Sequence, residues 1–193
     1  SCCAGYKAAW HRQDGFPSPA FLESVNPGFG DLYTLRYGGP ILDPGRQAGG
    51  LTREWAEKLG LRTGLPVAAG IIDAHAAVLG GGVSRPGTMF MIMGTSTCHM
   101  LMSEKEVLVE GISGVVQGGI VPGLFAYEAG QASVGDIFAW FVENQVPGSY
   151  EAGARERGVT IHDYLSELAE RRRPGQSGLL ALDWWNGCRT PLV

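Results

Sequence analysis

The sequence contains few cysteines and no long apolar run. Its four cysteines, Cys2, Cys3, Cys98 and Cys188, form one adjacent pair and two distant single residues. They lack the C-x-x-C spacing of a metal site and are too few for a disulfide scaffold, so they predict reduced thiols and a cytoplasmic protein. No stretch approaches the ~18 apolar residues of a membrane span, so no membrane association is expected.

Positive charge is also scarce. Lys and Arg together number 15 against 19 Asp and Glu, for a formal net charge of −4. A nucleic-acid-binding protein normally presents a basic face, so no nucleic-acid partner is expected. The sequence has no G-x-x-x-x-G-K-[ST], G-x-S-x-G or H-E-x-x-H motif. The three chemistries typical of those motifs, in phosphate-loop enzymes, serine hydrolases and zinc proteases, are therefore not indicated.

Glycine, by contrast, is abundant. It supplies 30 of the 193 residues, about twice the usual ~7%, and shows no collagen-like period of three. Such a chain needs tight turns and close backbone approaches, which favours small-molecule and phosphate sites. The length suits one domain or two small lobes. The chain does not start with methionine and both ends are abrupt, which predicts a piece of a longer polypeptide.

Apolar runs and periodic patterns alternate along the chain and predict an α/β fold. Glycine-rich residues 80–87 are the expected boundary between a first lobe, residues 1–84, and a second, residues 85–193. Residues 14–50 are expected to be loop and turn, with one short helix at 21–25. Helices are predicted from N-cap Thr52 to Gly60, over 73–79, over 135–145 (Ile137, Phe138, Trp140 and Phe141 on the buried side) and over 161–173. Strands are predicted at 65–72 and 179–184, both buried, within 111–127, and in a hairpin of Thr88–Met93 and Cys98–Met102.

Asp73 is a candidate functional residue because it follows the apolar run that ends at Ile72. Ligands gather at the carboxyl ends of strands in α/β sheets, and a carboxylate there could accept a proton from a substrate hydroxyl. The alternative is a cap for the following helix, and both roles can coexist.

The turn Gly94-Thr95-Ser96-Thr97 combines backbone N–H groups with hydroxyls, which can form a concavity for phosphate oxygens. From the tetrapeptide alone, an ordinary hairpin turn is the better interpretation. Lys7 and Glu128, each taken alone, are more often surface charges. His75 and His99 lack the spacing of a metal pair, so capping or packing is expected of them.

Six blocks, taken in order, resemble the FGGY family of carbohydrate kinases. They cover nearly the whole chain, and their ordered set is far more specific than any one of them. The blocks are residues 3–11 (CAGYKAAWH), 70–75 (GIIDAH), 94–98 (GTSTC), 121–131 (VPGLFAYEAGQ), 135–141 (GDIFAWF) and 182–187 (LDWWNG).

This resemblance implies an actin-like, ribonuclease H-like fold present as parts of two lobes, with ATP and sugar meeting in the cleft between them. The implied activity is ATP-dependent phosphorylation of the ketopentose ribulose at its 5-hydroxyl. Asp73 matches the catalytic base, and Lys7 and Glu128 match positions that hold the hydroxyls of the ketose. Gly94, Thr95, Ser96 and Thr97 match the second phosphate-binding loop, which reverses the hairpin-only interpretation. Mg²⁺ would bridge phosphate oxygens, and no protein ligand for a metal is expected.

The chain departs from the family pattern in two places. The first phosphate loop, Asp-x-Gly-Thr, and the later glycine-rich adenosine segment do not occur, so the isolated chain is expected to be inactive. Incomplete sheets would expose strand edges, which favours association into homo-oligomers. Two alternatives stay open: a kinase of the same family for another pentulose or polyol, and a non-catalytic actin-like fragment that only binds sugar.

Overall fold

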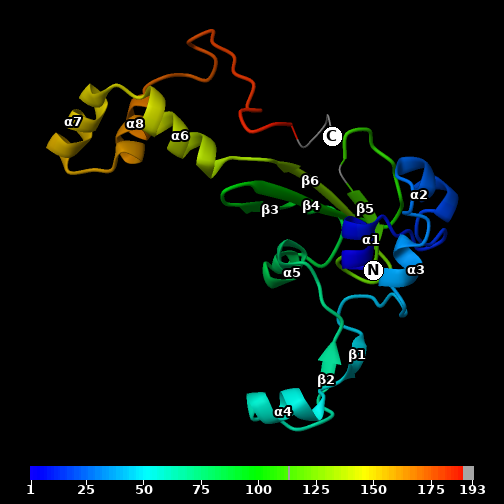
Figure 1. Ribbon diagram of the computed structural model, residues 1–193. Coiled ribbons are helices and arrows are strands. Elements are labelled where there is room, and N and C mark those ends of the chain that lie inside the picture. Colours follow the sequence, from blue (N-terminus) through cyan, green and yellow to red (C-terminus); the bar gives the residue numbers. More distant parts are fainter. Residues whose placement is uncertain (113, 189–193) are drawn as a thin grey trace. The chain divides into compact units, whose positions relative to one another are not determined.

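The computed structural model describes residues 1–112 and 114–188, which form two compact units (Figure 1). Unit 1 comprises residues 1–92 and 98–130, and unit 2 comprises residues 93–97 and 131–188. The predicted second lobe, 85–193, includes residues 113 and 189–193, which lie outside the described residues. The division into lobes at residue 84 stays a prediction. No helix in the described ranges is long and apolar enough to cross a membrane.

A four-stranded sheet organises unit 1. Its strand order is β3-β4-β6-β5, and β5 and β6 pair antiparallel with Val116 opposite Ala126. The strands are β3 (Phe90–Met93), β4 (Thr97–Ser103), β5 (Gly114–Gln117) and β6 (Phe125–Gln131). Only three residues connect the neighbouring strands β3 and β4, a link that an antiparallel hairpin allows and a parallel crossover does not. The predicted hairpin is confirmed, except that its first strand begins at Phe90 and not at Thr88, and that Thr97 belongs to β4 and not to the turn.

Two helices pack on this sheet, α1 (Cys2–Ala8) and α5 (Asp73–Gly80). The helix predicted over residues 73–79 is therefore confirmed. The core cluster joins one residue of α5 to residues of β4, β6 and the loop before β6. These are Val78, Met100, Met102, Ile120 and Ala126, each no more than 2% exposed.

The remainder of unit 1 includes α2 (Pro19–Val25), α3 (Leu32–Arg36), β1 (Gln47–Gly50), α4 (Arg53–Leu59) and β2 (Pro66–Ala68). The helix from Thr52 to Gly60 is confirmed as α4, because the Thr52 hydroxyl accepts the Trp55 N–H and Gly60 is left-handed. Residues 14–50 contain α3 and β1 as well as turns, so their reading as loop was partly wrong.

The buried strand predicted at residues 65–72 was also wrong. Its strand, β2, is shorter, pairs antiparallel with β1, and is exposed along its length. Val67 keeps 41% of its surface exposed. β1 and β2 form a two-stranded ribbon in which every residue is exposed, so β2 is not buried although its residues are apolar.

Unit 2 contains three helices, α6 (Gly135–Gln145), α7 (Gly148–Arg157) and α8 (Ile161–Glu170). α6 has the predicted bounds, but the predicted buried side was wrong: none of its residues is buried, and Phe138 is 63% exposed. α8 begins at the predicted Ile161, where the Thr160 hydroxyl accepts the Asp163 N–H, but it ends at Glu170 and not at residue 173. α7 was not predicted.

The buried strand predicted at residues 179–184 was wrong as well. No strand within the described part of the chain pairs with this segment, and Leu180 is fully exposed. A strand requires a hydrogen-bonding neighbour for its backbone, and the apolar composition of the segment cannot supply one.

Candidate functional site

Three of the predicted site residues lie in unit 1, on elements that pack against one another. Lys7 is exposed near the end of α1. It lines an open hollow together with Tyr33, Arg36 and Tyr37, which the sequence reasoning did not link to it. The hollow opens toward solvent, so the Lys7 ammonium is accessible to a ligand.

Asp73 is the first residue of α5 and is exposed. Its Oδ1 accepts the Ala74 N–H at 2.7 Å, so the carboxylate is held at the N-terminus of the helix. A negative charge is favoured at that end by the helix dipole. The N-cap of α5 is Ile72, which makes no side-chain cap hydrogen bond, so the expectation that Asp73 caps the helix was wrong. The exposure of Asp73 leaves its carboxylate accessible to a substrate.

Glu128 is buried in the middle of β6, with 5% of its surface exposed. Its Oε2 lies 3.4 Å from Nε2 of His75, whose side chain is 1% exposed. The Tyr6 ring packs on the same imidazole, with ring centroids 4.4 Å apart. The interpretation of Glu128 as a solvated surface charge was wrong, because the carboxylate lies inside unit 1 against His75.

The charges of Lys7, Asp73 and Glu128 all act on His75. Burial has the largest effect on the pKa of His75 and lowers it. Of the three charges, the carboxylates of Glu128 and Asp73 raise this pKa, and the ammonium of Lys7 lowers it. One imidazole therefore lies within electrostatic reach of all three predicted sugar-binding groups. An ammonium can donate to the hydroxyls of a polyol, and carboxylates can accept from them.

The predicted phosphate loop lies in unit 2 and contacts the beginning of α6. The Thr95 carbonyl accepts the Val134 N–H at 2.8 Å, and the Gly94 carbonyl accepts the Gly135 N–H at 3.2 Å. Gly94 and Thr95 are exposed, whereas Thr97 is buried. The turn is thus fixed to the N-terminus of α6 by its own carbonyl groups, which occupy the Val134 and Gly135 N–H groups.

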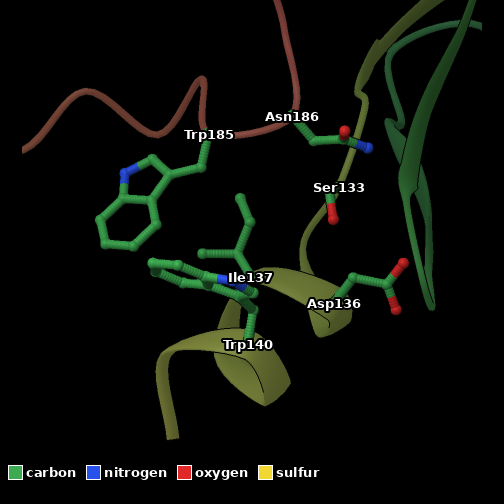
Figure 2. Close-up of a pocket in the computed structure, with 6 residues that line it drawn as sticks. All are labelled: Ser133, Asp136, Ile137, Trp140, Trp185 and Asn186. Atoms are coloured by element: carbon green, nitrogen blue, oxygen red, sulfur yellow. The ribbon is translucent and has the colours of Figure 1, made fainter. Parts of the chain in front are cut away.

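A cavity of about 290 Å³ lies beside this contact in unit 2, and the sequence reasoning missed it. Figure 2 shows the indoles of Trp140 and Trp185 on one side, with the polar side chains of Ser133, Asp136 and Asn186 on the other. The two indoles meet edge to face with centroids 5.5 Å apart. Two tryptophans on segments far apart in the sequence gave no periodic pattern from which this contact could be read.

His75 and Tyr6 were the other residues that sequence reasoning did not place in the site. His75 was expected only to cap or pack. The Tyr6 hydroxyl donates to the Ala126 carbonyl at 2.6 Å, which ties α1 to β6 two residues from Glu128. The position of Tyr6 beside Lys7, and of His75 two residues after Asp73, was the available sign of a shared cluster.

The described residues contain no group of three or more His, Cys, Asp or Glu side chains placed to hold a metal ion. Mg²⁺ in phosphoryl-transfer sites is usually held by substrate phosphates, water and one or two carboxylates. The exposed carboxylate of Asp73 could contribute to that mode of binding.

Comparison with known proteins identifies the family. The C-terminal domain of the FGGY family of carbohydrate kinases matches residues 89–193. A ribulokinase of Shouchella clausii (strain KSM-K16) is 53% identical over 193 residues, covering 100% of this chain and 34% of the relative. A ribulokinase of Halalkalibacterium halodurans is 54% identical with the same coverage. The chain spans about a third of the length of these curated relatives.

A solved structure agrees with these matches. The crystal structure of xylulose kinase from Rhodospirillum rubrum matches with a TM-score of 0.65 and 28% identity, over 80% of this chain and 30% of that one. Since the family's C-terminal domain matches more than half of the chain, the chain belongs to the FGGY family of carbohydrate kinases. The predicted α/β, actin-like fold class is confirmed.

Proposed function

We propose that this chain provides part of the active site of an ATP-dependent carbohydrate kinase that phosphorylates ribulose at its 5-hydroxyl. The observation that supports the proposal is that the charges of Lys7, Asp73 and Glu128 all act on His75, in a chain about 53% identical to ribulokinases over its whole length. A ketopentose presents several hydroxyls, and this cluster offers both a donor and acceptors for them.

Each of the three residues has a distinct role in the proposed reaction. Asp73 accepts the proton of the 5-hydroxyl as that oxygen attacks the γ-phosphate, because its exposed carboxylate is held in place by the Ala74 N–H. Lys7 donates to a sugar oxygen, and Glu128 accepts from a sugar hydroxyl. Burial of Glu128 restricts the carboxylate to one region, which favours one orientation of the sugar.

We further propose that Gly94, Thr95, Ser96 and Thr97 bind phosphate oxygens of ATP. The contact between this turn and the start of α6 supports the assignment, because it holds in place a turn that carries the Thr95 and Ser96 hydroxyls. ATP with Mg²⁺ supplies the phosphoryl group and neutralises its charge when bound. The chain's own residues hold the phosphates of ATP in place, so that ATP does not bind in a misaligned position.

The proposed setting is the cytoplasm, with a small ketopentose as partner and neither nucleic acid nor membrane. All four cysteines are free thiols, which suits a reducing compartment. Assembly into homo-oligomers stays a prediction and can be checked by light scattering of the purified protein.

The proposal can be tested in a hybrid enzyme, defined as the Halalkalibacterium halodurans ribulokinase in which this chain replaces the matching third. Ribulose-dependent ADP release should be retained in the hybrid, and Asp73→Asn should lower kcat by about 10²–10⁴-fold. Asp163→Asn, which changes an exposed aspartate of α8, serves as the matched control and should leave kcat within about twofold of the hybrid.

Three results would contradict the proposal. A hybrid with higher kcat/KM for xylulose or glycerol than for ribulose would favour the alternative of another polyol kinase. Full activity after Asp73→Asn would remove Asp73 as the base. Binding of ribulose without any ADP release would favour a fragment that only binds sugar.

A further inference from the structure

His75 is the most deeply buried polar side chain at the meeting point of α1, α5 and β6, with 1% of its surface exposed. Its Nε2 lies 3.4 Å from Oε2 of Glu128. Among the described residues, neither ring nitrogen has a protein hydrogen bond of good geometry. A buried imidazole in this situation loses its contact with water, so its place in the fold requires a physical reason.

Tyr6 holds the imidazole from the side of α1. The two rings are inclined at 48° with centroids 4.4 Å apart, and the Tyr6 hydroxyl is anchored on the Ala126 carbonyl. Gly114 gives the Tyr6 ring its space, because a Cβ there would lie 2.9 Å from ring carbons. The imidazole therefore has little freedom to turn away from Glu128.

The charged and titratable groups around His75 come from all three elements. β6 contributes Glu128, α1 contributes Lys7 and Tyr6, and α5 contributes Asp73. Burial lowers the pKa of His75, and it raises the pKa of Tyr6. Both rings are thus uncharged at neutral pH, and the carboxylate of Glu128 faces the edge of a neutral imidazole.

We propose that His75 is a positioning residue for the sugar: its imidazole, clamped by Tyr6, orients the buried Glu128 carboxylate. This inference rests on the proposed role of Glu128 in binding the ketopentose. The chemistry follows from the geometry, since an N–H on Nε2 attracts one carboxylate oxygen and leaves the direction of the other fixed. Loss of that N–H removes one of the interactions that orient the carboxylate.

Two substitutions separate the N–H from the ring. His75→Phe keeps an aromatic ring against Tyr6 but removes the N–H, whereas His75→Gln keeps a donor but removes the ring. In the hybrid enzyme, His75→Phe should raise the KM for ribulose about tenfold while kcat and the KM for ATP change less than threefold. His75→Gln should restore the KM for ribulose to within about threefold of the hybrid.

The control is His162→Phe, which changes an exposed histidine of α8 in unit 2 and should leave all three constants unaltered. An unchanged KM for ribulose in His75→Phe, in an assay where Glu128→Gln does raise it, would overturn the inference. An equal loss of soluble protein in both His75 variants, with normal kinetics of what remains, would mean a structural role only and would also overturn it.

A second measurement does not depend on turnover. In the 193-residue chain labelled with ¹⁵N-histidine, long-range ¹H–¹⁵N spectra report the tautomer and protonation of each imidazole. His75 should be neutral at pH 7 with its proton on Nε2, and Glu128→Gln should shift its Nε2 resonance while leaving His162 unshifted. A charged His75, or one insensitive to Glu128→Gln, would overturn the inference. If the unmodified hybrid itself released no ADP with ribulose, the proposed function would fail, and these spectra would still decide the coupling between His75 and Glu128.

Discussion

Substituting alanine for each of two adjacent glycines at the end of α5 should change the free energy of unfolding in opposite directions. A Cβ at Gly81 would lie 2.5 Å from Cζ of Phe90, closer than real Cβ contacts allow, whereas a Cβ at Gly80 would meet no atom within 4 Å. The φ of Gly81 is −81°, a value that alanine adopts easily, so the collision with Phe90 is the only cost of Gly81→Ala. Gly80 is helical and its substitution removes backbone entropy from the unfolded chain.

The magnitudes follow from these contacts. Phe90 packs against the core cluster of unit 1, so its ring can yield only by losing apolar packing. Overpacking of this kind costs about 1–3 kcal/mol. Gly80→Ala should instead stabilise the chain by about 0.5–1 kcal/mol. Each variant adds one methyl group to the chain. Gly81→Ala should lower the free energy of unfolding, and Gly80→Ala should raise it.

Urea unfolding of the 193-residue chain, followed by circular dichroism, measures both effects. With an m-value of about 2 kcal/mol/M, Gly81→Ala should lower the midpoint by about 0.5–1.5 M, and Gly80→Ala should raise it by about 0.2–0.5 M. In the hybrid enzyme, Gly81→Ala should also reduce turnover, because α5 begins with Asp73. Equal midpoints for the two variants would refute the reasoning from the contact with Phe90.

Four further predictions follow from single contacts. Tyr6→Phe leaves the buried Ala126 carbonyl without its donor and should cost about 1–3 kcal/mol in urea unfolding; a cost near zero would mean that water replaces the hydroxyl. Burial lowers the pKa of His75, so protonation favours the unfolded chain. Stability should be full above about pH 6.5 and fall as the pH drops below it, and this fall should be smaller in His75→Phe. Thr160→Ala removes the cap of α8 and should lower the stability of that helix, measured by hydrogen exchange, by about 1 kcal/mol. An equal loss of stability in α4 would contradict a local effect. The 193-residue chain alone should release no ADP with ribulose under conditions in which the hybrid enzyme does.

Local patterns predicted those elements whose ends and periodicity are encoded in adjacent residues. α4 has its N-cap, Thr52, and its closing glycine, Gly60, within nine residues, and α6 has the bounds that its pattern indicates. Burial could not be predicted in the same way, because it depends on what packs against the element. β2 and residues 179–184 are apolar, yet both are exposed in this chain. α6 likewise presents Phe138 to solvent.

The candidate site shows the same division. Asp73 was singled out because it follows an apolar run, although the strand expected there ends at Ala68, and Lys7 and Glu128 were singled out only through the resemblance to a family. That Glu128 is buried against an imidazole depends on a contact between residues 53 positions apart, and no local pattern reports such a contact. His75 was assigned to packing because a lone histidine has no spacing to interpret.

Glycine links the composition of this chain to the geometry of its site. The sequence predicted close backbone approaches, and several glycines with ordinary φ lie where a side chain would collide. A Cβ at Gly5 would lie 2.5 Å from Val116 of β5, one at Gly114 would meet the Tyr6 ring, and one at Gly81 would meet Phe90. These contacts are at the interfaces of α1 and α5 with the sheet, so glycine allows both helices to approach the sheet closely. Because α1 carries the proposed sugar-binding lysine and α5 the proposed base, the depth of that approach sets the distance of both groups from the glutamate on β6. Larger residues at these glycines should therefore alter sugar binding even though none of the glycines contacts a sugar.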